Sequence, residues 1–198
     1  MDRRAFVGRI TALSAAALPW PTESGAGVAS CGSWARITGV IYDARYRDAR
    51  RFAAALVVTG ASPFDTQPDP VWLWRRTLRS HVTRNPDGAL AGMTPYCEQK
   101  LIEACASELG LRTLFEATHD ARNSPQLIHR WSGADGRHLR QAFGATNPAW
   151  PASLAQALAL GMLTRCSNRH TIFADARPAA DRKGTLVSWV IGPRHNTN

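Results

Sequence analysis

The segment from residue 89 to residue 117 constrains the fold most, because strand and helix signals alternate within it. An apolar run at 89–93 follows a turn-forming Asn-Pro-Asp-Gly sequence, and a second apolar run occupies 111–117. Between them, residues 94–110 carry apolar side chains at helical spacing and end in a glycine. Strand, helix and strand over about thirty residues predict a βαβ unit, in which a right-handed crossover joins two parallel strands.

The sequence before this unit shows the same alternation. Residues 36–42 are apolar and β-branched and predict a buried strand, and residues 44–58 predict a helix. Residues 61–70 are rich in turn formers and predict at most a short extended piece, after which Asp69 and Pro70 predict the capped start of another helix. Together these elements predict an α/β fold with a doubly wound, mostly parallel, Rossmann-like sheet in three layers.

The last part of the chain is predicted to be less regular. Residues 120–168 are rich in Gly, Asn, Pro, Arg and His and predict an irregular insertion, with one helix at 153–164. After it, apolar runs at 171–174 and 185–191 are separated by a short loop. This arrangement predicts a closing antiparallel strand pair.

The tryptophans of the chain have different predicted environments, some in the core and some at the surface. Trp72 and Trp74 lie two positions apart on a predicted helix, so they point to different faces and one of them is expected in the core. Trp131 and Trp150 fall in the irregular insertion, where aromatic side chains could form a binding surface if they are exposed. Trp189 is expected to pack in the core.

The N-terminal residues carry the pattern of an export signal. The sequence RRAFV, which contains Arg3, Arg4 and Phe6, precedes a modest apolar run. This pattern resembles a twin-arginine (Tat) signal peptide, whose paired arginines a translocase reads during export. An ordinary amphipathic helix is the alternative. We expect residues 1–30 to be the signal peptide, residues 31–198 to form a single α/β domain, and the mature protein to be periplasmic.

Two forms of processing are open for this signal. Residues 27–29 offer a small-x-small cleavage site, whereas residues 28–31 resemble a lipobox, in which Cys31 would be acylated to give a membrane-anchored lipoprotein. No later apolar run reaches the ~18 residues that a transmembrane helix requires. Membrane contact is therefore expected only if Cys31 is acylated.

The chain is strongly basic, with a formal net charge of +9. Arginine supplies almost all of the positive charge, because Lys100 and Lys183 are the only lysines, and the tightest arginine group, at residues 45–51, suits a solvated helix face. In an exported protein this charge favours anionic envelope partners over nucleic acid. The expected partners are the Tat translocase during export and a periplasmic protein.

Four cysteines, Cys31, Cys97, Cys105 and Cys166, allow three disulfide pairings. Cys97 and Cys105 lie on one predicted helix about 12 Å apart, which is too far for a bridge between them. Bridges to other partners such as Cys166 and a set of buried thiols are both open.

Candidate site residues follow from strand ends. In an open α/β sheet, ligands bind beyond the carboxyl ends of the parallel strands. This rule selects Asp43, Thr94, and His119 with Asp120. A carboxylate, a hydroxyl and an imidazole on one rim would suit acid–base chemistry. The simpler roles are helix capping for Asp43 and Thr94, and a solvated loop position for His119.

Cofactor and metal motifs are not evident. The chain has no P-loop, G-x-S-x-G, H-E-x-x-H or C-x-x-C sequence, and no G-x-G-x-x-G follows a predicted strand. Cys166 and His170 have the spacing of half a metal site, without a second pair nearby in the sequence. We therefore expect no cofactor and no metal.

The order of motifs resembles small, uncharacterised Tat-exported proteins of Gram-negative bacteria. It runs from the RRAFV signal through a Tyr-Asp pair and a Gly-Met-Thr sequence, each before a helix, to a final LVSWVI strand. The resemblance implies a periplasmic α/β domain and transfers no active site.

We expect an accessory or small-ligand-binding domain. The alternative is a small periplasmic hydrolase or other acid–base enzyme that uses Asp43, Thr94 and His119, so enzyme activity is open, with binding favoured.

Overall fold

The computed structural model describes residues 35–120, 127–132, 134, 136–144, 149–161, 170–174 and 185–193. They all belong to Cys31–Asn198, the second of the two units into which the chain divides. The expected signal peptide, Cys31 and Cys166 lie outside the described residues. In the part of the chain that is described, no helix has the length and apolar character that crossing a membrane requires.

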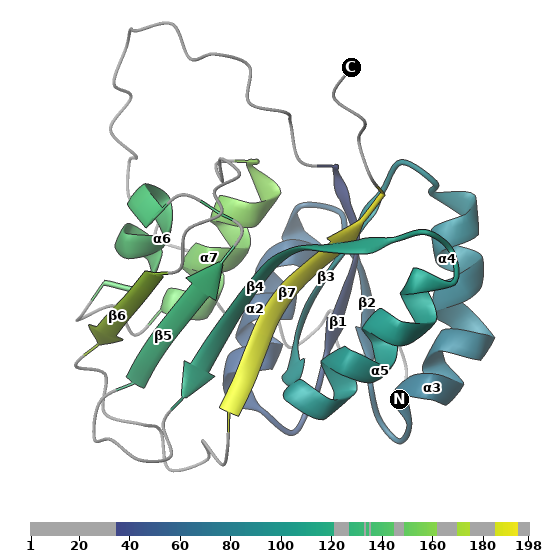
Figure 1. Ribbon diagram of the computed structural model, residues 1–198, viewed down its shortest axis with the longest axis horizontal. Helices are drawn as coiled ribbons and strands as arrows, with labels where there is room; N and C mark the ends of the chain where they lie inside the picture. The colour runs from purple at the N-terminus through teal and green to yellow at the C-terminus, as the bar shows by residue number, and fades with distance from the viewer. Residues whose placement is uncertain are drawn as a thin grey trace, which may run out of the picture. The chain divides into compact units, whose positions relative to one another are not determined.

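The domain is α/β and is built on one open, mixed sheet, in which the described residues supply seven strands (Figure 1). The strands are β1 (Ile37–Tyr42), β2 (Ser62–Asp65), β3 (Ala89–Pro95), β4 (Arg112–Asp120), β5 (Leu127–Ser132), β6 (His170–Ala174) and β7 (Thr185–Gly192). Their order across the sheet is β2-β1-β3-β7-β4-β5-β6. β1 pairs in parallel with β2 and β3, and every other neighbouring pair is antiparallel.

The helices connect these strands. They are α2 (Arg47–Val58), α3 (Pro70–Leu73), the π-helical turn η1 (Trp74–Leu78), α4 (Arg79–Arg84), α5 (Tyr96–Ser107), α6 (Gly136–Ala142) and α7 (Trp150–Ala159). α3, η1 and α4 follow one another without an intervening loop. One long helical stretch therefore links β2 to β3, as the sequence predicts.

The start of α3 shows why this stretch begins where it does. The Asp69 carboxylate accepts hydrogen bonds from the backbone N–H groups of Val71 (2.7 Å) and Trp72 (3.1 Å), and Pro70 stands in the first turn. This confirms the predicted capped start. Trp74 is buried whereas Trp72 is 51% exposed, as their two-residue spacing predicts.

Helices lie on both faces of the sheet. Figure 1 shows α5 in front of the strands, with α3 and α4 beside it, and α2 behind them. Side chains from η1, α5 and β7 meet in one buried cluster that includes Leu78, Ile102 and Trp189. α2 packs against α7 as well as against β1 and β3. The two sides of the sheet therefore have separate apolar contacts.

The position of β7 is the main departure from the predicted sheet. β3, α5 and β4 form at the predicted positions, and β3 and β4 run in the same direction because each is antiparallel to β7. β7 nevertheless lies between them, so that only β2, β1 and β3 form a run of adjacent parallel strands. From Leu186 to Gly192 every residue of β7 is buried, which requires neighbours on both edges and cover on both faces.

The predicted antiparallel pair of 171–174 with 185–191 is wrong. β6 pairs with β5 at the edge of the sheet, whereas β7 lies in its interior. The expected irregular insertion at 120–168 is also partly wrong, because its described residues include β5, α6 and α7. Helix α7 begins at Trp150, before the predicted 153–164, with a proline in its first turn.

Candidate functional site

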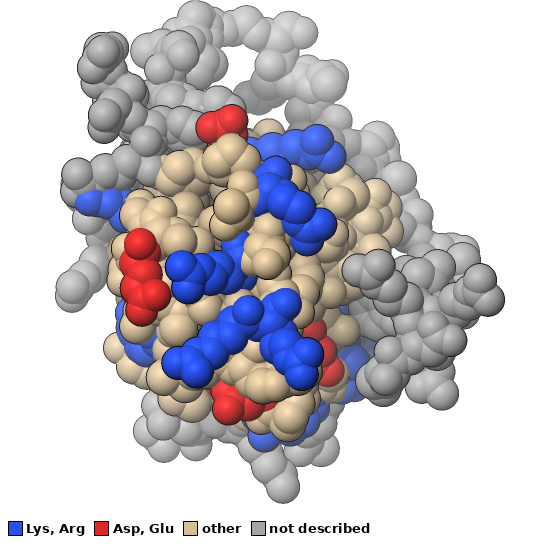
Figure 2. Space-filling model, turned by 90° about the vertical axis from the view of Figure 1, so that its right-hand side faces the viewer, with Lys and Arg blue, Asp and Glu red and all other residues tan. Residues whose placement is uncertain are grey.

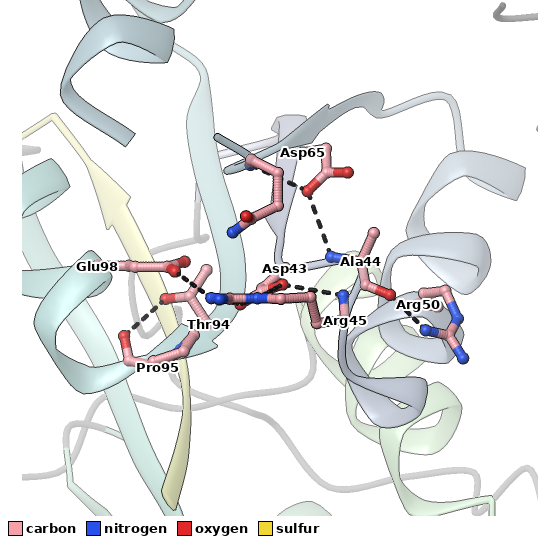
Figure 3. Close-up of polar contacts among 9 residues, drawn as sticks. Asp43, Ala44, Arg45, Arg50, Asp65, Thr94, Pro95 and Glu98 are labelled. Atoms are coloured by element: carbon pink, nitrogen blue, oxygen red, sulfur yellow. Dashed lines mark hydrogen bonds and ion pairs between the residues drawn. The ribbon is translucent and has the colours of Figure 1, made fainter. Parts of the chain in front are cut away.

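The carboxyl ends of the three adjacent parallel strands meet at one edge of the sheet. In the register, Tyr42 of β1 lies level with Asp65 of β2 and with Met93 of β3. The next residue in each segment is therefore Asp43, Thr66 or Thr94 at the same edge. The Thr66 N–H donates to the Tyr42 carbonyl (3.0 Å), which holds β2 against β1 at this point. We call Asp43, Arg45, Asp65, Thr66, Thr94 and Glu98 the rim cluster; Figure 3 shows most of it.

Arg45 is the central cation of the rim cluster. Its Nη2 lies 2.6 Å from Asp43 Oδ2 and 3.0 Å from Glu98 Oε1, and its Nε lies 3.0 Å from both Asp43 oxygens. Asp43 is fully buried, whereas the Arg45 side chain is 59% exposed. The hydrogen bond to Asp43 raises the pKa of Arg45. The guanidinium therefore bridges two carboxylates from the solvent side.

The turn that presents Arg45 is built by backbone contacts. Asp43 Oδ1 accepts a hydrogen bond from the Arg45 N–H (2.9 Å), and Asp65 Oδ1 accepts one from the Ala44 N–H (3.3 Å). Arg50 of α2 donates to the Ala44 carbonyl. Asp43 thus shapes the turn before α2, and the N-cap position itself is Tyr46, whose side chain makes no capping bond.

Negative charge exceeds positive charge within the rim cluster. Burial raises the pKa of Glu98, and the carboxylates of Asp43 and Asp65 raise it further. Thr66 and Arg45 oppose this rise without cancelling it. The carboxylates at the ends of β1 and β2 therefore act on Glu98 in the first turn of α5, with Arg45 as the cation of the cluster.

Two buried polar atoms in the rim cluster, a hydroxyl and a carboxylate oxygen, make no hydrogen bond of normal geometry. Thr66 is fully buried and Glu98 is 8% exposed. Among the described residues, neither Thr66 Oγ1 nor Glu98 Oε2 has a partner with hydrogen-bond geometry. The Thr66 hydroxyl nevertheless lowers the pKa of Glu98, so these two groups act on each other. Buried polar atoms of folded proteins are nearly always satisfied, and the remaining acceptor capacity of the two groups suits an additional donor.

Thr94 has a structural role within the rim cluster. Its hydroxyl donates to the Pro95 carbonyl (3.2 Å) and accepts from the indole N–H of Trp189 (3.2 Å). The N-cap of α5 is Pro95, so Thr94 does not cap that helix with its side chain. The protein itself therefore uses the Thr94 hydroxyl both as a hydrogen-bond donor and as an acceptor.

His119 lies away from the rim cluster. Thr94 pairs with Val187 of β7, while the His119 Nε2 atom lies 2.8 Å from the Oγ of Ser188, the next residue along. Successive residues of a strand point to opposite faces, so His119 and Thr94 are on opposite faces of the sheet. The structure therefore does not bring His119 together with Asp43 and Thr94.

His119 instead belongs to a buried aromatic group. Its Nδ1 lies 2.7 Å from the Nδ1 of His129, its cross-strand partner on β5, and the rings of Phe143 and Trp150 pack against both histidines. His119 is 2% exposed, which excludes the solvated position considered above. Asp120 ends β4 opposite Thr185, on the far side of β7 from β3.

Trp131 and Trp150 do not form the exposed aromatic surface that their place in the sequence left open. Their side chains are 3% and 1% exposed. Trp131 packs against Phe143, and Trp150 opens α7, which packs on α2. The segment that carries them forms regular structure, and its aromatic side chains are part of the core.

Four residues of the rim cluster are absent from the sequence-based candidates: Arg45, Asp65, Thr66 and Glu98. The strand-end rule would have selected Asp65 and Thr66 if β2 had been treated as a full strand. Glu98 stands in the first turn of α5, where acidic residues are common for local reasons. Arg45 belongs to a group of arginines that the sequence places on a solvated face.

The described residues hold no grouping of three or more His, Cys, Asp or Glu side chains that is arranged to bind a metal ion. Cys97 is exposed and Cys105 half-buried, and both are free thiols, which agrees with the prediction that they do not bridge each other.

Searches against protein-family models, curated proteins and solved structures found no match.

Proposed function

We propose that the chain is a small-ligand-binding domain whose site is the rim cluster, and that its ligand is a small organic cation with N–H donors, such as an amine or a guanidine. The observation that carries this proposal is the pair of buried groups, Thr66 Oγ1 and Glu98 Oε2, which make no hydrogen bond of normal geometry beside an excess of carboxylates. A ligand ammonium or guanidinium group supplies both the missing donors and the missing positive charge.

The neighbouring residues support binding more than acid–base catalysis. Asp43 is held by three contacts from Arg45, and the Thr94 hydroxyl is engaged by Trp189 and Pro95. The imidazole expected for a hydrolase, that of His119, is bonded within the aromatic group on the other face of the sheet. A hydrolase at this rim would need a different base, and the rim cluster offers carboxylates for that role.

The finer fold description belongs to the same proposal. A doubly wound, Rossmann-like, three-layer domain places its ligand where adjacent parallel strands end. The parallel order β2-β1-β3 and the position of the rim cluster at the carboxyl ends of these strands support that description.

The proposed site of action is the periplasm. Its support is the sequence alone, namely Arg3, Arg4 and Phe6 before a short apolar run. Replacing both arginines with lysine should retain the protein in the cytoplasm of a Tat-competent host, as measured by cell fractionation. Intact mass of the exported chain should separate simple cleavage near residue 30 from acylation of Cys31, and unchanged export of the lysine variant would contradict the proposal.

Ligand binding is tested by calorimetric titration of the protein at low ionic strength with agmatine, putrescine and methylguanidine, and with urea and succinate as neutral and anionic controls. We expect at least one of the cations to bind and both controls to fail. Glu98→Gln should weaken that binding about tenfold, the effect of losing one charge-assisted hydrogen bond. Glu108→Gln, an exposed position just beyond the same helix, is the matched control and should leave binding unchanged.

Two outcomes of these titrations would overturn different parts of the proposal. Failure of all three cations overturns the proposed ligand class. Equal effects of Glu98→Gln and Glu108→Gln overturn the proposed site, because a loss that follows net charge alone is not specific to the rim cluster.

A further inference from the structure

The outer side of the helical stretch formed by α3, η1 and α4 is basic along η1 and α4. Its exposed residues include Arg75, Arg76, Arg79 and Arg84, and no acidic residue occurs from 70 to 84. The opposite side of the stretch is apolar and buried in the domain core. The stretch is therefore held in place by its apolar side, and only its cationic side is available to a partner.

Exposed aromatic and aliphatic side chains accompany these arginines. Trp72 of α3 is 51% exposed, and Tyr96 and Leu101 of α5 are 53% and 46% exposed. α3 packs against α5. Cys105 of α5 packs against the buried cluster that also contains Trp74 and Leu78 of η1, so η1 also lies near α5.

Figure 2 shows the side of the molecule that carries these helices. Lys and Arg side chains gather over the middle of this face, and most of the Asp and Glu side chains lie toward its edges. On α5, Lys100 forms ion pairs with Glu103 (2.7 Å) and Glu116 (3.4 Å), so its charge is largely compensated. The excess positive charge of this face therefore comes from the arginines of η1 and α4.

The aromatic rings on this face each have a cation beside them. The Arg76 guanidinium lies 5.0 Å from the centre of the Trp72 ring, and the Lys100 ammonium lies 5.2 Å from the centre of the Tyr96 ring. The cation over each ring leaves at most one face of that ring for stacking on a nucleobase, the contact that nucleic-acid sites require of their aromatic residues. Indole and phenol rings next to cations are instead typical of the headgroup region of a bilayer.

We propose that the basic helix face, defined as Trp72, Arg75, Arg76, Arg79, Arg84, Tyr96 and Leu101, docks on the surface of a membrane that contains anionic phospholipids. The guanidinium groups would bind lipid phosphates, and the exposed rings and Leu101 would enter the headgroup layer. Since the apolar side of the helical stretch is buried in the domain, the contact is peripheral and reversible.

This inference is independent of the ligand site and of Cys31. It departs from the expectation that membrane contact requires an acylated cysteine, because the arginines supply an attraction of their own. An electrostatic contact of this kind weakens as salt shortens the range of the charges.

The test uses the full chain with Cys31→Ser, so that no acyl chain is present, in sedimentation with vesicles. The vesicles contain phosphatidylcholine alone or phosphatidylcholine with about 30 mole per cent phosphatidylglycerol. Binding should occur only to the anionic vesicles and should fall at least tenfold between about 0.05 M and 0.5 M salt. The triple variant of Arg75, Arg76 and Arg79 to Gln should bind about 100-fold more weakly, given the contribution of each arginine near a charged surface.

The matched control removes the same charge elsewhere. Arg130, Arg137 and Arg140 are exposed on β5 and α6, and their triple replacement by Gln should leave vesicle binding within about twofold. Trp72→Ala should weaken binding without changing its salt dependence. Thermal unfolding of each variant verifies that it is folded. The salt and lipid dependence of vesicle binding by the protein with all its arginines tests the proposal without any of these variants.

Three results would overturn the proposal. Equal losses in the two triple variants would show a general charge effect, and equal binding to neutral vesicles would remove the role of the arginines. Tighter binding to a single-stranded oligonucleotide than to anionic vesicles, measured by fluorescence anisotropy at the same salt, would assign the face to nucleic acid instead.

Discussion

Trp189 of β7 lies directly across from Gly92 of β3, and a Cβ atom at Gly92 would stand 2.2 Å from the indole Cε2 and Cζ2 atoms. The indole fills the space that a side chain at position 92 would need. Its N–H then reaches the Thr94 hydroxyl at 3.2 Å. The same side chain therefore joins β7 to β3 in the core and holds the strand end that carries the rim cluster.

Gly92→Ala should destabilise the domain by about 3 kcal/mol, the upper range for overpacking of a well-filled core. Trp189 is fully buried and has no room to move away from the new methyl group. Urea unfolding monitored by circular dichroism measures the change. Gly144→Ala is the control, because its nearest neighbours would lie 3.4 Å from the added Cβ atom and no loss of similar size is expected.

Thr66→Val should change the free energy of unfolding by no more than about 1 kcal/mol, because the buried hydroxyl makes no hydrogen bond of normal geometry and only its weaker interaction with Glu98 is lost. The same change should weaken binding of the cationic probe roughly fivefold, because one acceptor of the site is lost. Unfolding and calorimetry on the same preparation give both values. A clear loss of stability would mean that the Thr66 hydroxyl serves the fold rather than a ligand.

Cation binding should strengthen as pH rises. Burial and the neighbouring carboxylates raise the pKa of Glu98 above its ordinary value of 4.5. A bound cation favours the ionised carboxylate and lowers that pKa, so binding releases a proton and the affinity increases with pH until Glu98 is ionised in the free protein. Titrations between about pH 4.5 and 8 should show a rise followed by a plateau.

The Glu98→Gln variant supplies the control for this pH dependence. Its affinity should be lower and nearly independent of pH over the window in which Glu98 ionises. An unchanged pH profile in the variant would assign the titration to a different group.

The pair formed by His119 and Ser188 should matter for stability and leave ligand binding unaffected. Ser188→Ala removes the hydroxyl that lies 2.8 Å from His119 Nε2 in a fully buried position, and should cost about 2 kcal/mol. Affinity of the rim cluster for the cationic probe should stay within about twofold, since the two groups lie on opposite faces of the sheet. A selective loss of binding or activity with normal stability would favour the acid–base alternative.

Local sequence patterns predict most of the individual elements correctly. The strands at 37–42, 89–95 and 112–120 and the helices at 47–58 and 96–107 form where the apolar spacing places them. The start of α3 follows from Asp69 and Pro70 alone, because a cap depends on residues within one turn. Asp43 and Thr94 are correctly placed at strand ends for the same reason.

The contacts of those residues depend on the order of the strands, which local patterns do not contain. His119 follows the same strand-end rule as Thr94, yet β7 enters between β3 and β4 and separates the two residues. Asp65 and Thr66 join Asp43 because β2, a strand of only four residues, pairs with β1 along its whole length.

The sequence by itself determined most of the helices and strands before residue 120, because backbone propensity, capping and apolar spacing act over a few residues. Only the tertiary structure decided that the C-terminal strand fills the middle of the sheet, and that Arg45 bridges Asp43 and Glu98. Both features depend on contacts between residues far apart in the chain. A strand as apolar as β7 is stable only when it has neighbours on both edges. Buried carboxylates are stable only when a cation lies beside them.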